Sequence, residues 1–179
     1  YMADAISRVT SGRKIGVFAR QHGPGVENTL GAIAQAYSES VPILVLPGGY
    51  DRRLAHVDPN FSSPRTMGTF TKSVEQLTSG AEVANVFRRA FTQLRNGRGG
   101  PCVVEIPRDV WGEDVPENFN YTPVVATRYG PDPDAVREAA ELLVGAKRPV
   151  IYAGQGVHYA RAWPQLRALA ELQIGRAHV

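Results

Sequence analysis

Apolar residues along the chain follow two alternating patterns. Short continuous apolar runs, typical of buried parallel strands, occupy residues 14–19 (KIGVFA), 41–46 (VPILVL) and 101–106 (PCVVEI). Apolar residues at helical spacing lie between or before these runs, at residues 2–9, 28–37 and 81–94. Strands that alternate with helices predict an α/β fold, a parallel sheet with helices on both faces.

Two segments interrupt this alternation. Residues 48–70 are broken by glycines and prolines and predict a long loop, of the kind that is functional or mobile in compact domains. Residues 111–130 contain Pro and Asn without any period, which favours an interdomain linker. We therefore expect a first domain at residues 1–110, this linker, and a second α/β domain that starts at residues 131–179.

The second domain opens with a helix, a strand and a further helix. Asp132 and Pro133 are typical of a helix start, and the apolar spacing continues to Val144. Residues 149–153 (PVIYA) predict a strand, Gly154-Gln155-Gly156 a turn and residues 162–172 a helix. Because one strand cannot bury both faces of a sheet, we expect only the truncated start of this domain.

The two ends of the sequence look unlike natural termini. The chain begins with Tyr1 inside a helical pattern, so we expect a start that is missing here. One coding of residues 174–179 (IGRAHV) matches a common sequencing-adapter sequence, so we expect these residues to be read-through. A natural turn, with Gly175 ending the helix, is the alternative.

Composition and charge exclude several classes of protein. The 179 residues are 43% hydrophobic and 21% charged, which is typical of globular domains and not of disorder. The net charge of +3 comes from scattered basic residues, so we expect no nucleic-acid partner. No apolar run approaches the roughly 20 residues of a membrane span. The single cysteine, Cys102, excludes an internal disulfide and a Cys-based metal site, and it suits a reducing cytoplasm.

A glycine-rich loop, Gly23-Pro24-Gly25-Val26-Glu27-Asn28, follows the first predicted strand. One interpretation is a plain strand-to-helix turn in which Asn28 caps the helix. A dinucleotide loop would need a third glycine where Asn28 stands, and Pro24 lacks an N–H that a pyrophosphate would use. The residue before the loop, His22, could act as an acid or base, although a surface histidine is the alternative.

The order and spacing of three stretches resemble the thiamine-diphosphate-dependent decarboxylase and carboligase family, in particular its acetolactate-synthase-like large catalytic subunits. The stretches are GPGVENTLGAIAQAYSESVPILVLPGG, GGPCVVEIPRDV and RPVIYAGQG, which begin at Gly23, Gly99 and Arg148. The resemblance as a whole covers almost the entire chain, roughly residues 1–173. The resemblance implies a pyrimidine-binding domain that lacks its N-terminal part, followed by the start of a central domain.

The resemblance implies a cofactor site in the glycine-rich loop, with Gly23, Pro24, Gly25 and Asn28 against the cofactor's pyrimidine. The family's catalytic glutamate would lie before Tyr1, outside this chain, so no catalytic residue is expected within it. Magnesium would be held by an absent third domain, and no metal ligand is expected here. FAD is a possible further cofactor, at Gly154-Gln155-Gly156.

The resemblance also implies a substrate, a small 2-oxo acid, and three residues near it. Arg53, the second arginine of an Arg-Arg pair, would lie near the substrate carboxylate, and Phe61 and Lys72 are the other candidates. Two departures weaken the likeness to acetolactate synthesis itself: Gly48-Gly49-Tyr50-Asp51 replaces the family's G-Q-V-P, and Ser62 replaces a glutamine after Phe61.

We therefore expect part of a cytoplasmic enzyme that decarboxylates a 2-oxo acid and ligates the product to a second carbonyl compound. The full-length parent would be a homodimer or homotetramer, and the piece by itself inactive. A non-catalytic cofactor-binding or regulatory relative is the first alternative. A nicotinamide-dependent oxidoreductase is the second.

Overall fold

A computed structural model describes residues 1–174 and divides the chain into two compact units. The first unit runs from Tyr1 to Thr127, and the second begins at Arg128. The elements of the first unit are α1 (Met2–Val9), β1 (Gly16–Arg20), α2 (Pro24–Glu27), α3 (Leu30–Ser38), β2 (Ile43–Gly49), the 3-10 helix η1 (Arg52–Leu54), α4 (Ser63–Met67), β3 (Ser73–Gln76), the 3-10 helix η2 (Gly80–Glu82), α5 (Val83–Arg95) and β4 (Cys102–Pro107).

The strands form a four-stranded sheet in the order β1-β2-β4-β3, and every neighbouring pair is parallel. The register places Phe18, Val45, Val103 and Val74 in one row across the sheet. This row faces one side of the sheet, where it packs with α1, α3 and α4. The predicted parallel sheet is confirmed.

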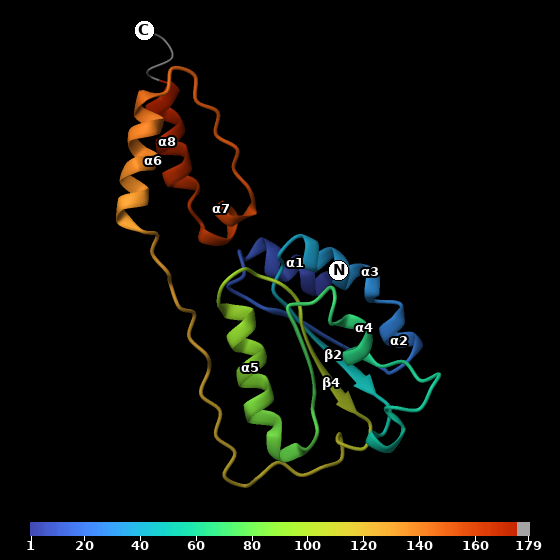
Figure 1. The fold of residues 1–179 in the computed structure, drawn as a ribbon. Coiled ribbons are helices and arrows are strands. Elements are labelled where there is room, and N and C mark those ends of the chain that lie inside the picture. The colour runs from blue at the N-terminus through green and yellow to red at the C-terminus, as the bar shows by residue number, and fades with distance from the viewer. Residues whose placement is uncertain (175–179) are drawn as a thin grey trace. The chain divides into compact units, whose positions relative to one another are not determined.

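The direction of the chain decides which helix covers which face. From β1 through α3 to β2, and from β2 through α4 to β3, the chain moves the same way across the sheet, so right-handed crossovers place both helices on one face. From β3 through α5 to β4 it moves back, so α5 covers the opposite face (Figure 1). The prediction of helices on both faces is therefore confirmed.

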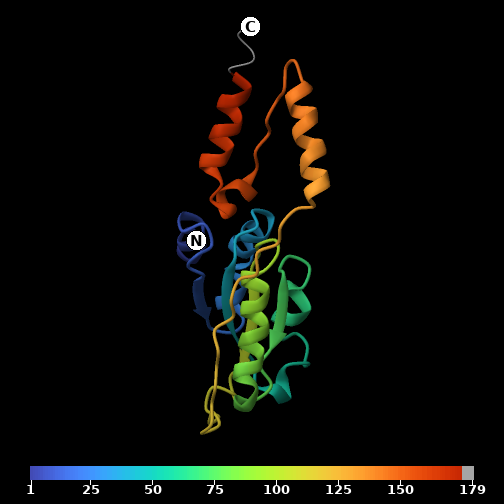
Figure 2. The ribbon, with the colours of Figure 1, turned by 90° about the vertical axis from the view of Figure 1, so that its left-hand side faces the viewer.

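Alternate residues of the two inner strands supply the two cores. In β2, Ile43 and Val45 belong to the core beneath α1, α3 and α4, whereas Leu44 belongs to the core beneath α5. In β4, Val103 belongs to the first core, and Cys102 and Val104 to the second. Since both faces are covered, these strands read as continuous apolar runs in the sequence. Strand β1 lies at one edge of the sheet (Figure 2).

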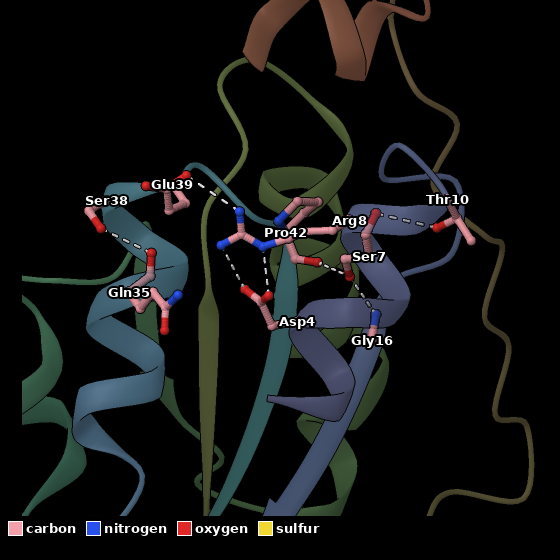
Figure 3. Close-up of polar contacts among 9 residues, drawn as sticks. All are labelled: Asp4, Ser7, Arg8, Thr10, Gly16, Gln35, Ser38, Glu39 and Pro42. Carbon is pink, nitrogen blue, oxygen red and sulfur yellow. Dashed lines mark hydrogen bonds and ion pairs between the residues drawn. The ribbon is translucent and has the colours of Figure 1, made fainter. Parts of the chain in front are cut away.

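The buried Ser7 links α1 to the starts of β1 and β2 through two hydrogen bonds. The Ser7 hydroxyl donates to the carbonyl of Pro42 at 2.6 Å and accepts from the amide of Gly16 at 2.8 Å (Figure 3). Gly16 is required there, because a Cβ would lie 1.9 Å from the Ala3 carbonyl oxygen. Beside this contact, Arg8 pairs with Asp4 at 2.7 Å and with Glu39 at 3.4 Å, which links α1 to the end of α3.

Three parts of the first unit differ from the sequence-based expectation. The expected long loop at residues 48–70 contains η1 and α4, and α4 begins after an N-capping Ser62 with Pro64 in its first turn. Strand β3 was not predicted, because its half-buried residues follow no clear apolar pattern. The helix expected at residues 28–37 begins at Leu30, after the separate short helix α2.

The second unit contains α6 (Pro133–Gly145), α7 (Gln155–Ala160) and α8 (Trp163–Ile174). The predicted start of α6 is confirmed: Asp132 is its N-cap and accepts from the amide of Asp134 at 2.8 Å. The strand expected at residues 149–153 is wrong. This segment has no regular secondary structure and pairs with no strand of the described residues, and Tyr152 is fully exposed. A parallel strand needs a hydrogen-bonded neighbour, and none of the strands up to residue 174 lies in this unit.

The helices of residues 1–174 include none with the length and apolar character needed to cross a bilayer. Of the predicted read-through at residues 174–179, only Ile174 falls within the described part, where it ends α8. The other five residues lie outside it.

Candidate functional site

An open pocket of about 370 Å³ lies at the carboxyl ends of β1, β2 and β4. Its lining comes from the ends of these strands and the turns after them: Ala19, Arg20, Gln21, His22, Gly48, Gly49, Arg108 and Trp111. In open parallel sheets, ligands bind at this edge. We therefore treat the pocket and the loop that follows His22 as the candidate site.

The Gly23–Asn28 loop continues directly from the pocket lining. Gly23 is buried, has φ +62° and precedes α2, and its carbonyl accepts from the amide of Val26 at 2.9 Å. This left-handed conformation favours glycine. Pro24 occupies the first turn of α2 and is exposed, as is Asn28 at its end. Asn28 therefore ends α2, and Thr29, not Asn28, precedes α3.

Three glycines at the centre of the site allow close packing. A Cβ on Gly48 would lie 3.2 Å from the His22 amide nitrogen, and a Cβ on Gly49 would lie 3.0 Å from the Glu105 side chain. A Cβ on Gly25 would lie 2.4 Å from Cγ of Gln21. At Gly48 the end of β2 therefore packs against the backbone of the turn after β1, and the ring of Tyr50 lies 4.7 Å from the His22 ring, centroid to centroid.

The two adjacent arginines after β2 have different surroundings. Arg52 pairs with Asp109 at 2.8 Å and with Glu113 at 2.5 Å, and it donates to the carbonyl of Thr78 at 2.7 Å. The Arg52 guanidinium, chiefly through its hydrogen bond, lowers the pKa of Asp109. Arg53 is 81% exposed, with Asp51 3.9 Å away. Arg52 therefore anchors the loop, and Arg53, the predicted substrate residue, is available to a ligand.

The other two predicted substrate residues lie elsewhere. Phe61 is partly buried and packs against the core beneath α3 and α4. Lys72 precedes β3, at the amino edge of the sheet, where its ammonium group donates to the carbonyls of Gln93 and Asn96 at the end of α5. Burial lowers the pKa of Lys72. Within this chain, neither residue reaches the pocket.

Of the residues that line the pocket, sequence reasoning considered His22 as an acid or base and missed the functional placement of the others: Ala19, Arg20, Gln21, Gly48, Gly49, Arg108 and Trp111. Each stands at or just after the carboxyl end of an apolar run, which is the signal that could have found them. Their proximity depends on the strand order, which the sequence did not reveal. The predicted turn Gly154-Gln155-Gly156 forms the start of α7, a helix of six residues, and follows an exposed segment instead of a strand.

Two family models match the chain. One, described as "Thiamine pyrophosphate enzyme, N-terminal TPP binding domain", matches residues 1–79, which include the Gly23–Asn28 loop. The other, described as "Thiamine pyrophosphate enzyme, central domain", matches residues 136–173. The chain belongs to the thiamine pyrophosphate enzyme family. The resemblance drawn from the sequence is thereby confirmed.

Among curated relatives of this family, the acetolactate synthase large subunit of Buchnera aphidicola (subsp. Acyrthosiphon pisum) is 33% identical over 96% of the chain. The acetolactate synthase isozyme 3 large subunit of Escherichia coli K12 is 32% identical over the same share. In both cases the chain spans 31% of the relative's length.

Two solved structures share the fold. Benzoylformate decarboxylase from Polynucleobacter necessarius matches with a TM-score of 0.81 and 26% identity, over 93% of this chain and 32% of that one. A protein from Mycobacterium smegmatis, described as "a putative thiamin diphosphate-dependent enzyme", matches with a TM-score of 0.83 and 24% identity, over 96% of this chain and 33% of that one. The second likeness concerns the fold alone.

Proposed function

We propose that this chain supplies the pyrimidine-binding side of an enzyme that decarboxylates a 2-oxo acid and transfers the product to a second carbonyl compound, as in acetolactate synthesis. The observation that carries this proposal is the Gly23–Asn28 loop. It stands at the carboxyl edge of the sheet, beside an open pocket, within the stretch that matches the N-terminal TPP binding domain.

The residues of the loop fit a flat heteroaromatic ring. Gly23 is buried and carries no side chain, and Pro24 and Asn28, at the two ends of α2, are exposed to a ligand. Thiamine diphosphate, when bound, supplies a stabilised carbanion for attack on the keto carbon of the substrate. The part of this chain would be to orient the pyrimidine against Pro24 and Asn28.

Arg53 is the candidate for the substrate carboxylate. Its guanidinium is exposed, and its ion pair with Asp51 is long, at 3.9 Å. Binding a substrate carboxylate would therefore break no strong interaction within the protein. Arg52 would act as a positioning residue, since its ion pairs hold η1 and thereby the backbone of Arg53. The catalytic glutamate before Tyr1, magnesium in a further domain, FAD and a homodimeric or homotetrameric parent stay predictions from the resemblance.

The test is calorimetric titration of the full-length protein with thiamine diphosphate and Mg²⁺, followed by an assay of pyruvate decarboxylation. We expect saturable binding, and weaker binding in Asn28→Ala. The matched control is Asn85→Ala, an exposed asparagine of α5 on the other side of the sheet. A folded protein that shows no binding would refute the proposal. Binding without turnover would favour the non-catalytic relative.

A further inference from the structure

Two arginines of the pocket have no side-chain partner among the described residues, 1–174. The first unit contains eleven arginines, and nine of them have a side-chain hydrogen bond, an ion pair or an aromatic contact: Arg8, Arg13, Arg52, Arg53, Arg65, Arg88, Arg89, Arg95 and Arg98. For Arg20 and Arg108, residues 1–174 provide none of these contacts. Both unpaired guanidinium groups line the same pocket.

The sheet register explains why these two side chains share a pocket. Arg20 ends β1 opposite Pro47 of β2, and the amide of Arg108 donates to the carbonyl of Gly49 at 3.1 Å. They therefore flank the end of β2, two strand spacings of about 5 Å each apart, with Arg108 three residues further along the strand direction than Arg20. Between them lie Gly48 and Gly49, which carry no side chain. Two flexible arginine side chains can reach into the space left between them.

Among the residues that line the pocket, the formal charges are those of Arg20 and Arg108, whereas Glu105, close to Gly49, accepts from the Ser63 amide at 3.0 Å and from Gln76 at 2.7 Å. None of the residues that line it is an Asp or Glu. The acidic residues that follow Arg108, namely Asp109 and Glu113, pair with Arg52 at 2.8 Å and 2.5 Å. Two unpaired guanidinium groups at an open pocket attract anions, and each can bind a carboxylate or phosphate through two hydrogen bonds. Trp111, 60% exposed, adds a flat apolar wall.

We propose that Arg20 and Arg108 together bind an oxyanion, the carboxylate or phosphate group of a small ligand, at the end of β2. The inference rests on the unpaired guanidinium groups and the bare glycines between them. It goes beyond the proposed function, because it concerns residues outside the Gly23–Asn28 loop and requires neither thiamine diphosphate nor Mg²⁺.

The test is an NMR titration of the full chain with pyruvate and, separately, with inorganic phosphate, monitored at the indole N–H of Trp111. We expect a saturable shift with at least one anion, and the preferred anion identifies the source of the oxyanion. Arg20→Gln and Arg108→Gln should each weaken binding about three- to tenfold. Arg108→Lys keeps the charge but not the paired hydrogen bonds, so its affinity for the anion should lie between those of the wild type and Arg108→Gln.

The matched control is Arg13→Gln, which removes the same charge from an exposed arginine before β1, at the amino edge of the sheet. It should leave binding unchanged. No saturable shift with either anion, or equal weakening by Arg13→Gln and Arg20→Gln, would overturn the inference. Because the titration contains no cofactor, its failure would leave the calorimetric test of thiamine diphosphate binding unaffected.

Discussion

Replacing Ser7 by Ala should strongly destabilise the first unit. Ser7 is fully buried, and its hydroxyl bonds two backbone groups from different strand ends, the carbonyl of Pro42 and the amide of Gly16. Alanine fits the space but leaves both groups without this partner. An unsatisfied buried group costs about 1–3 kcal/mol, so we expect the free energy of unfolding to fall by about 2–4 kcal/mol. Such a loss is a large part of a typical domain stability of about 5–15 kcal/mol.

The assay is urea unfolding followed by tryptophan fluorescence. The chain has two tryptophans, and in a Trp163→Phe background the signal of Trp111 reports the first unit. The matched control is Ser38→Ala, drawn in Figure 3, whose exposed hydroxyl donates to the Gln35 carbonyl at 3.0 Å. We expect the control to stay within about 0.5 kcal/mol of its parent.

Hydrogen exchange provides a second measurement of the same contact. The Gly16 amide, which donates to the Ser7 hydroxyl, should be protected in the parent and exchange faster in Ser7→Ala. A Ser7→Ala variant as stable as Ser38→Ala, with unchanged protection at Gly16, would refute the reasoning.

Three further predictions follow from local contacts. Arg52→Gln should raise the pKa of Asp109 in an NMR titration. Because Arg52 lowers the folded-state pKa of Asp109, the ion pair stabilises the folded protein at pH values above the ordinary Asp pKa. This stabilisation is lost as the pH falls through the folded-state pKa, where the wild type and the variant should become equally stable. Cys102, whose thiol pKa is raised by burial, should react with Ellman's reagent at neutral pH only after unfolding. Gly23→Ala should cost about 1–2 kcal/mol in urea unfolding because of its positive φ, whereas Gly31→Ala, with open space around it in α3, should be neutral or stabilising.

The sheet could be predicted where burial on both faces leaves a continuous apolar run, as in β2 and β4. It could not be predicted at β3, an edge strand whose four residues are each half-buried and which depends on pairing with β4. The strand expected at residues 149–153 shows the reverse case. An apolar run alone does not make a strand when no neighbouring strand pairs with it.

In the candidate site too, neighbouring residues of the sequence could be predicted, whereas residues that only the sheet brings together could not. The Gly23–Asn28 loop could be predicted because its residues are consecutive, and Gly23 shows the positive φ that such a loop requires. Lys72 was placed near the substrate by resemblance, yet in a parallel sheet a residue that precedes β3 lies at the amino edge. Arg20 and Arg108 are 88 positions apart in the sequence, and only the order β1-β2-β4 brings them to one pocket.

The reversal of the chain at β3 explains where the pocket forms. After β2 the chain continues to the face of the sheet that α4 covers, and after β4 it continues to the opposite face, which α5 covers. On that opposite face, Glu113 accepts from the amide of Gly80 at 2.7 Å. Neighbouring strands whose connections depart to opposite faces leave a crevice at their carboxyl ends. The turns that hold Gly49 and Arg108 border this crevice, and the bonds of Arg52 to Asp109 and Glu113 join its two sides. The topology thus creates the opening, and Arg52 joins its walls while Arg20 and Arg108 stay unpaired within residues 1–174.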